Sequence, residues 1–435
     1  MIASTPSVLI VGEDPAGLTA AYHLAQRGYH VTVIDRHATL GGYSHVAPLP
    51  AALMGCHHAT WTLLKSLHRP ITHPSHIDIP LEFQLRDGRI VRYPDTWFPG
   101  PFRPLLNVLR WSAISWSERR QLVSWLERIW EGETELPTNL EQRTADDWLH
   151  SLGQSEDTRQ AVWNPLARWL TGNDLRTLSA EALATSIRPF FLNSRADNRL
   201  TLFPNSLQET LLQPLIQAAI KAGTLIRLDT EAAQLRYAHD RVSGVQLRDG
   251  AILEADWYIT AVSPQHLTPL LPERWLSRYA YFQQFTELTT TDQTIMQGMA
   301  DRLLTTPRLM LLSHQPDYSA LTIIGDQMRT LFSLATTNSQ TRPAQPASNI
   351  EAGLADLLRS LKLLSSDTHL KAIQCHTIPN AILPLKPGTK MLRPIQRSPI
   401  ANLFVAGAWT DTGWPCNLES AIESGNRCAR AIQEQ

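Results

Sequence analysis

A strand, a glycine turn, a helix and a second strand follow one another directly within the first 35 residues. Residues 7–12 are continuously apolar up to Gly12, as in a strand buried in a parallel sheet. Apolar residues then recur at helical spacing over 15–28, and residues 30–35 form a second apolar strand that ends at Asp35. This order within about 30 residues is that of the βαβ unit that binds dinucleotides. The pattern predicts a Rossmann-like sheet at the start of the chain.

The phosphate-binding turn of this unit reads Gly12-Glu13-Asp14-Pro15-Ala16-Gly17, with Asp14 where the usual fingerprint has its second glycine. Pro15 suits the first helical position, so Asp14 is predicted to cap the helix and to accept from the amide of Ala16 or Gly17. A pyrophosphate would use the same amides. A like charge about 4 Å away costs roughly 4 kcal/mol at an effective dielectric constant near 20. Asp14 therefore either substitutes for the phosphate or forces the nucleotide into a shifted position.

The chain has 435 residues, too many for one compact core, so two packed domains are expected. Buried strands are also predicted at 256–262 and 402–407, followed by a helix at 417–434. The first and last elements thus both resemble parts of a nucleotide-binding domain, with the middle of the chain inserted. The predicted boundaries are 1–65, 200–265 and 395–435 for the nucleotide domain, and 66–199 and 266–394 for an inserted α+β substrate domain.

The inserted segments contain other local patterns. Hairpins are predicted around Asp87-Gly88 and Asp249-Gly250. Residues 337–348 are polar and contain proline, which predicts a surface loop. Further helices are predicted at 105–131, 144–152, 157–170 and 206–223, and a strand at 224–228.

Composition excludes several classes of protein. Hydrophobic residues make up 43% and charged residues 18%, so the chain is not disordered. The formal net charge of −1 gives no field that would attract nucleic acid. The four cysteines are scattered without a CxxC pair. A histidine-rich stretch at residues 57–76 matches no metal motif, so no metal is expected. No segment approaches the roughly 20 apolar residues of a membrane-spanning helix.

The end of the chain carries a more specific signal. Residues 402–425 read NLFVAGAWTDTGWPCNLESAIESG, and the doublet Gly41-Gly42 follows the acidic strand end. The chain resembles the amine-oxidase and phytoene-desaturase flavoprotein superfamily, and within it the hydroxysqualene dehydroxylases, also called squalene-associated FAD-dependent desaturases. The resemblance covers nearly the whole chain, and its most specific part is Trp409-Thr410-Asp411-Thr412-Gly413 with Pro415. Less specific similarity occurs at residues 55–58, 98–117, 163–166 and 202–204.

The resemblance implies a fold, a cofactor and a reaction. The fold is α/β, with a Rossmann-like FAD-binding domain split in sequence. The reaction belongs to squalene and hopanoid biosynthesis: reduced FAD removes the hydroxyl of hydroxysqualene to give squalene. The implied partners are a squalene-like polyisoprenoid, a membrane surface and, as a candidate, a squalene synthase-like enzyme. The implied location is cytoplasmic, peripheral on the inner face of the cell membrane.

The resemblance also implies the flavin contacts, and three of them depart from the family pattern. Asp14 replaces glycine, Tyr43 stands where the family usually has arginine, and Ala408 stands where it usually has aspartate. The positions implied to contact the cofactor are Gly12, Asp14, Gly17, Asp35, Gly41, Gly42, Tyr43, Gly407, Ala408, Trp409 and Thr410.

Two interpretations therefore remain open. In the first the chain binds FAD in a shifted manner and is an enzyme; in the second it is a flavin-deficient lipid-binding or scaffold homologue. Within the first, a carotenoid or phytoene desaturase-like dehydrogenase is the alternative activity, because it shares the fold and the cofactor.

The resemblance implies that residues 55–58 lie near the flavin or substrate, and the other catalytic and substrate-side residues are predicted from position and residue type. His57 or His58 could protonate a departing hydroxyl, although a packing role is the more common one for each. Asp411 either caps the last helix or faces the flavin. Residues 97–116 interleave aromatic residues with two arginines, which suits a membrane interface as well as an ordinary lid. The residues assigned to the membrane or substrate side are Trp97, Phe98, Phe102 and Trp163, the last as a wall of the substrate cavity.

Overall fold

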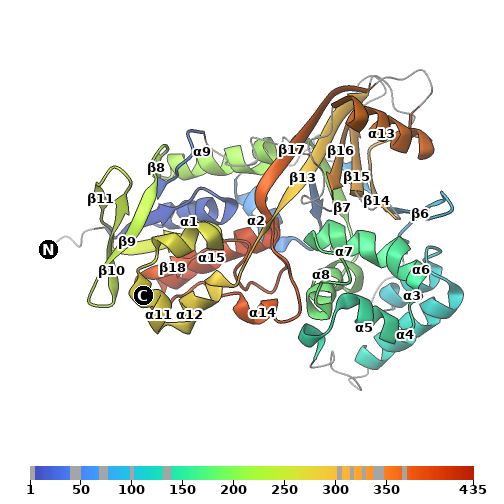
Figure 1. Ribbon diagram of the computed structural model, residues 1–435, viewed down its shortest axis with the longest axis horizontal. Coiled ribbons are helices and arrows are strands. Elements are labelled where there is room, and N and C mark those ends of the chain that lie inside the picture. The colour runs from blue at the N-terminus through green and yellow to red at the C-terminus, as the bar shows by residue number, and fades with distance from the viewer. Residues whose placement is uncertain are drawn as a thin grey trace.

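The computed structural model describes residues 5–39, 50–67, 77–97, 102–130, 139–300, 306–313, 318–325, 330–336, 347–364 and 370–435. Among these residues, five strands form a parallel sheet in the order β18-β12-β1-β2-β8 (Figure 1). The strands are β1 (Ser7–Val11), β2 (His30–Ile34), β8 (Leu225–Arg227), β12 (Trp257–Thr260) and β18 (Leu403–Val405). Segments from both ends and the middle of the chain thus meet in one sheet. They fall inside the ranges 1–65, 200–265 and 395–435 that the sequence predicts for the nucleotide domain.

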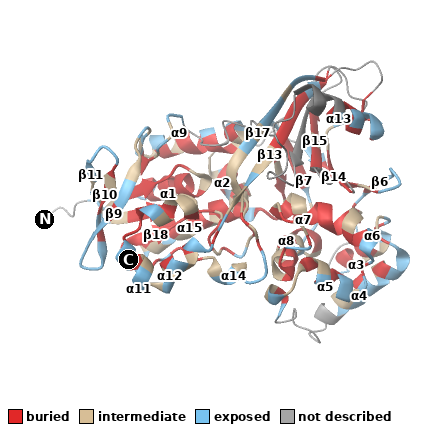
Figure 2. Cartoon of the chain, viewed as in Figure 1, coloured by how far each residue is buried: buried red, intermediate tan, exposed pale blue. Residues whose placement is uncertain are grey.

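Both faces of this sheet are covered. Val8 and Ile10 of β1 pack with the helices α1 (Pro15–Ala25) and α15 (Leu418–Gln433). Leu9 and Val11 belong to the cluster on the other face. That face is covered by β9 (Ala232–Ala238), β10 (Arg241–Leu247), β11 (Ile252–Leu253), α10 (Pro264–Leu267), α11 (Glu273–Arg278) and α12 (Ala280–Gln283). Burial on both sides explains why the strand is continuously apolar, and Figure 2 shows the resulting buried centre.

The helix α1 begins as its residue types predict and ends at Ala25, three residues before Gly28. Asp14 is its N-cap, with the side chain accepting from the amide of Gly17, and Pro15 occupies the first helical position. Helix α15 begins in the same way at Asn417, which caps it through the amide of Ser420. Helix α1 packs against α15 and against α9 (Gln213–Lys221). Because α1 follows the end of β1 after a short turn, its N-terminus lies at the carboxyl end of the sheet (Figure 1).

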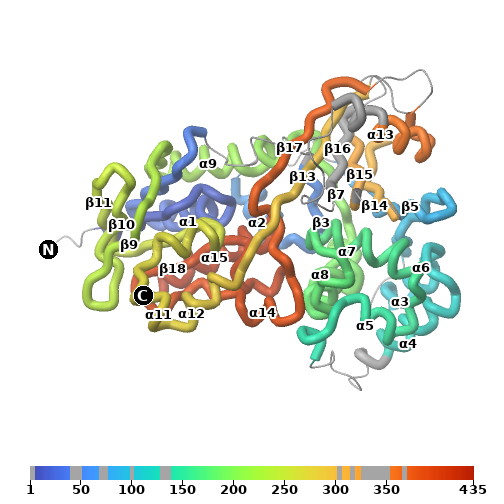
Figure 3. The backbone as a smooth tube through the Cα atoms, viewed as in Figure 1, coloured from blue at the N-terminus to red at the C-terminus, as the bar shows by residue number. Residues whose placement is uncertain are grey.

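A second, larger sheet lies beside the first. Within the described residues its order is β17-β13-β16-β15-β14-β5-β6. Helix α13 (Ala347–Ser360) packs on one face through Leu354 and Leu358, and α7 (Asn164–Thr171) packs on β14 and β15. The strands are β5 (Leu81–Gln84), β6 (Ile90–Arg92), β13 (Thr291–Ala300), β14 (Arg308–Leu312), β15 (Tyr318–Gly325), β16 (Thr330–Thr336) and β17 (Leu370–Ile382). The long strands β13 and β17 run side by side from this sheet back to the nucleotide domain, as the tube in Figure 3 shows.

The remaining elements complete the inserted domain and the junction. A small sheet joins β3 (Pro50–Met54), β7 (Leu200–Ser206) and β4 (Ile77–Ile79). The helices are α2 (His58–Ser66), α3 (Arg103–Arg110), α4 (Trp116–Trp130), α5 (Ala145–Ser151), α6 (Glu156–Thr158), α8 (Ala180–Leu192) and α14 (Thr389–Leu392). Two π-helical turns, Arg159–Trp163 and Gln208–Leu212, lead into α7 and α9.

Most local predictions are confirmed, and two are wrong. Both predicted hairpins form, as β5–β6 and β10–β11. The single helix predicted at 105–131 is instead two helices, α3 and α4. The chain turns at Trp111, which is buried, and Ser115 then bonds Glu118 at the start of α4. The helix predicted from residue 206 starts later, because Ser206 still belongs to strand β7. Of the predicted loop, residues 337–346 lie outside the described residues.

The contact between α1 and α15 leads to a stability prediction. A Cβ atom at Gly425 would lie 2.3 Å from the carbonyl oxygen of Ala16, whereas one at Gly353 in α13 would meet nothing within 4 Å. We expect Gly425→Ala to lower the free energy of unfolding by about 1–3 kcal/mol through overpacking. The matched change Gly353→Ala should raise it by about 0.4–1 kcal/mol. Urea denaturation measures both, and equal effects would contradict the close packing of the two helices.

Candidate functional site

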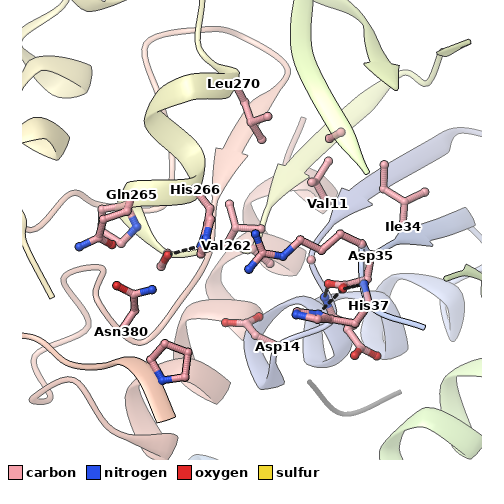
Figure 4. Close-up of a pocket in the computed structure, with 18 of the residues that line it drawn as sticks. Val11, Asp14, Ile34, Asp35, His37, Val262, Gln265, His266, Leu270 and Asn380 are labelled. Atoms are coloured by element: carbon pink, nitrogen blue, oxygen red, sulfur yellow. Dashed lines mark hydrogen bonds and ion pairs between the residues drawn. The ribbon is translucent and has the colours of Figure 1, made fainter. Parts of the chain in front are cut away.

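A groove lies at the carboxyl ends of β1, β2 and β12, where parallel sheets of this kind bind ligands (Figure 4). Its volume is about 630 Å³, within the range of roughly 300–1,000 Å³ typical of cofactor sites. The ionisable lining residues are Glu13, Asp14, Asp35, Arg36, His37, Glu231, Arg248 and His266. The neutral lining residues include Gln265, Thr290, Asn380, Ala381, Ala408 and Trp409. Figure 4 shows Asp35 and Asn380 at opposite ends.

Gly12 allows the floor of the groove to form. Its φ angle is +107°, a region that favours glycine, and a Cβ atom there would lie 2.1 Å from the carbonyl oxygen of Ala261. Gly17 has a similar constraint, because its Cβ would lie 2.4 Å from the carbonyl oxygen of Gly12. Both glycines bring the turn close to the end of β12. Gly12 lines the groove, whereas Gly17 is buried behind it.

Asp14 places a carboxyl group where the groove meets the start of α1. Its Oδ1 accepts from the Gly17 amide at 2.8 Å, as the sequence predicts. The pKa of Asp14 is raised to about 7: burial is the main cause, the helix amides of Gly17 and Ala16 lower the pKa, and the nearby charges of Asp35 and Glu13 add to the increase. Near neutral pH this group is therefore balanced between its charged and its neutral form.

Asp35 is bound by the protein itself. Its carboxylate accepts from the amide of Glu13 at 3.1 Å, the amide of His37 at 2.8 Å, and the ring Nδ1 of His37 lies at 2.7 Å. Asp35, an implied cofactor contact, thus also fixes the turn after β2. Ligand atoms of Glu13, Asp35 and His37 lie within 4.8 Å of one another, a cluster that the sequence did not predict.

The closing segment forms the neutral side of the groove. Ala408 and Trp409 line it, and the indole Nε1 of Trp409 donates to the carbonyl of Val262 at 3.0 Å. Gly407 and Thr410 lie behind them: the Gly407 amide donates to Ser424 at 3.1 Å, and the Thr410 hydroxyl bonds the Gly407 carbonyl. The structure therefore brings the first βα turn and the closing segment to one groove.

Two residues that support this segment were not assigned a site role from the sequence. The Arg393 guanidinium donates to the carbonyls of Ala408, Trp409, Thr410 and Trp414 at 2.6–3.1 Å. Glu419 accepts from the amides of Ala59 and Thr60 at 2.7 and 2.9 Å and so ties α15 to the start of α2. Nothing in the local sequence around Arg393 signals this role, since its four partners follow it by 15–21 residues.

The predicted catalytic residues lie outside the lining of this groove. His57 is buried with its ring edge-on to Trp414, and neither ring nitrogen has a hydrogen-bond partner in the described part of the chain. Burial lowers the pKa of His57 to about 4, so it is neutral at pH 7. His58 is largely exposed and pairs with Asp197 at 2.6 Å. Asp411 lines a separate small cavity with Arg393 and Trp414.

The described residues assigned to the membrane and substrate side do not line this groove either. Trp163 is buried in the helical core, where it bonds Gln154 at 3.0 Å and packs edge-on against Trp111. Its role as a cavity wall stays a prediction. Trp97 and Phe102 are exposed, with 77% and 58% of their surface accessible. Gly41, Gly42, Tyr43 and Phe98 lie outside the described residues.

Comparison with known proteins gives consistent results. The family model for flavin-containing amine oxidoreductases matches residues 15–433. A probable zeta-carotene desaturase of Synechococcus elongatus is 25% identical over 482 residues, covering 98% of each chain. A 15-cis-phytoene desaturase of the same organism is 24% identical over 466 residues, covering 98% of this chain and 95% of the relative. Among solved structures, an oxidoreductase from Methanosarcina mazei aligns over 99% of this chain and 100% of its own, with a TM-score of 0.73 and 14% identity.

The site fits the flavin dinucleotide that this family model implies. The groove is lined by both ionisable and neutral residues, as a ligand with phosphates and an uncharged ring needs. Gly12 has no side chain to keep a ligand away from the backbone, and the small side chain of Ala408 leaves space beside Trp409. Gly12, Asp35, Ala408 and Trp409 would hold the group. Asp14 opposes it in its charged form, as do the acidic lining residues Glu13, Asp35 and Glu231, and the raised pKa of Asp14 reduces its own opposition. None of the helices in the described ranges is long and apolar enough to cross a membrane.

The raised pKa of Asp14 predicts how FAD affinity depends on pH. Below pH 7 Asp14 is already protonated, so its contribution is constant; above pH 7 binding of the pyrophosphate requires proton uptake. We expect affinity to fall by up to about tenfold per pH unit above pH 7 until the pKa of the complex is reached. Fluorescence titration of the apoprotein with FAD measures this.

Asp14→Asn is the matched variant, because asparagine keeps the helix cap without the charge. His37 and His266 also line the groove and are present in both proteins, so the difference between the two profiles isolates Asp14. The variant should bind FAD more tightly above pH 7 and lose the steep decline. Superimposable profiles would contradict the assignment.

Proposed function

Because the chain belongs to the flavin-containing amine oxidoreductase family, we propose that it is the member that reductively removes the hydroxyl of hydroxysqualene to give squalene. Family membership makes the chain an FAD-dependent oxidoreductase, and the retained groove leaves little support for a flavin-deficient scaffold. The hydroxysqualene assignment rests on the closing segment. Its most specific resemblance to the hydroxysqualene dehydroxylases lies in Trp409-Thr410-Asp411-Thr412-Gly413 and Pro415.

The neutral end of the groove supports a substrate without charge. Thr290, Pro379, Asn380, Ala381 and Trp409 line it, and none of these side chains bears a charge. A polyisoprenoid alcohol needs an apolar surface and few polar contacts, whereas an amine would favour a carboxylate or an exposed aromatic cage. These uncharged residues support a substrate of the polyisoprenoid class, and the closing segment carries the finer assignment to hydroxysqualene.

The chain's own residues would position the reactants and exclude water. When bound, reduced FAD supplies the hydride that replaces the allylic hydroxyl. Trp409 is held by its bond to Val262 and packs edge-on against Phe285, so the neutral wall is rigid. Arg393 fixes the backbone beneath it. Neutral His57 is a poor proton donor at pH 7, so we do not retain it as the acid.

Carotenoid desaturation is the second candidate. The zeta-carotene and phytoene desaturases that align with nearly the whole chain favour it, because their substrates are also long polyisoprenoids. The hydride would then pass from the substrate to the oxidised flavin.

Product analysis separates the two activities. We expect the FAD-loaded protein, chemically reduced, to convert hydroxysqualene to squalene, and the oxidised protein to leave phytoene unchanged. Chromatography with mass detection measures both products. Desaturated carotenoid in place of squalene would establish the second candidate, and turnover of neither substrate would contradict the polyisoprenoid proposal.

We further propose that the protein reaches its substrate at the inner face of the cell membrane, where a squalene synthase-like enzyme would supply it. Trp97, Phe102 and Trp116 are exposed around α3, and Arg110 at the end of that helix is exposed beside them in the chain. Exposed aromatic residues with neighbouring cations suit a headgroup region.

Liposome flotation tests the membrane surface. We expect Trp97→Ser with Phe102→Ser to reduce binding to anionic vesicles by about tenfold or more, since each removes a large apolar contact. Met391→Ser is the matched control, because Met391 is 78% exposed but lies at α14. Equal flotation of the wild type and the double variant, or equal loss with the control, would contradict the proposed surface.

A further inference from the structure

The N-terminus of α1 already holds an anion of its own. Asp14 accepts from the Gly17 amide at 2.8 Å, so this amide, which a phosphate would otherwise use, has an internal partner. Glu13 and Asp35 add further acidic groups on the same side of the groove. A bound pyrophosphate would therefore find its strongest attraction elsewhere in the groove.

Arg36 supplies a cation in the same groove. It follows β2 directly, lines the groove and is exposed there. No ion pair joins Arg36 to any carboxylate in the described part of the chain, and the adjacent Asp35 is engaged by Glu13 and His37. Its guanidinium thus retains its donors for a ligand.

His266 is a second donor in the groove. It lies on α10, and Figure 4 shows its ring in the pocket with Asp14, its Nδ1 held by Ser263 at 2.8 Å. A hydroxyl that donates to Nδ1 leaves Nε2–H free to donate to a ligand. Arg36 and His266 line the same groove. Burial is the main cause that lowers the pKa of His266, and the charge of Arg36 lowers it further.

We propose that Arg36 and His266 bind the pyrophosphate of the flavin dinucleotide, in place of the α1 N-terminus that Asp14 occupies. The site is then shifted from the helix axis toward α10 and the end of β2. The positive charge of Arg36 offsets the charge of Asp14, so the groove accepts a dianion despite its acidic turn. This inference rests on the flavin dependence of the protein.

Titration of the apoprotein with FAD tests the proposal, with binding followed by flavin fluorescence. Arg36→Gln should weaken FAD binding by about 10- to 100-fold, as expected for the loss of a charge-assisted bond. His266→Phe should weaken it by about 3- to 10-fold. Arg248→Gln is the matched control: Arg248 also lines the groove but is paired with Glu231 at 2.9 Å, so we expect a change below about threefold.

A second measurement guards against misfolding and against failure of the premise. Thermal unfolding of each apoprotein should give the same midpoint as the wild type, because Arg36 is exposed and makes no ion pair in the described ranges. If the wild type binds no FAD, the proposed function fails. If the wild type binds FAD and Arg36→Gln binds it equally well, or if Arg248→Gln has the larger effect, the assignment of the pyrophosphate to Arg36 and His266 is wrong while the proposed function stands.

Discussion

The site depends on how closely the first βα turn approaches the end of β12. The carbonyl oxygen of Ala261 occupies the space that a side chain at residue 12 would need, so the turn can pass only because Gly12 is present. Parallel pairing of β1 with β12, and of β12 with β18, then brings the closing segment to the same edge of the sheet. The groove is therefore lined by residues that lie about 250 to 400 positions apart in the chain.

The second constraint is electrostatic. A helix N-terminus in this position normally attracts an anion, and here the chain provides one through Asp14. An internal anion stabilises the helix but competes with a phosphate for the same amides. The raised pKa of Asp14 and the cation at Arg36 both reduce this competition. The family's cofactor and the chain's unusual turn are therefore compatible, and the scaffold interpretation is not needed to explain Asp14.

The sequence predicted features that depend on neighbours a few residues apart. The βαβ unit, the cap at Asp14 and both hairpins follow from periodicity, helix capping and turn residues, whereas the last helix is capped by Asn417 and not by Asp411. The break after α3 was missed because it depends on burial of Trp111 in the tertiary structure. Apart from the hairpin β5–β6, the strands of the large sheet were not predicted: β17 is mostly exposed or half-buried, so it lacks a continuous apolar pattern. Arg393, Arg36 and His266 could not be assigned from local pattern, because their partners are brought to them only by the fold.

The most direct test of this account is the flavin content of the purified chain after incubation with FAD and removal of the unbound cofactor. Acid denaturation releases any bound flavin, and chromatography identifies and quantifies it. The account predicts one FAD per chain, released intact as the dinucleotide. A chain that retains no flavin, even when Asp14 is kept protonated by a mildly acidic buffer, would contradict the central claim that the turn and the closing segment form one flavin site.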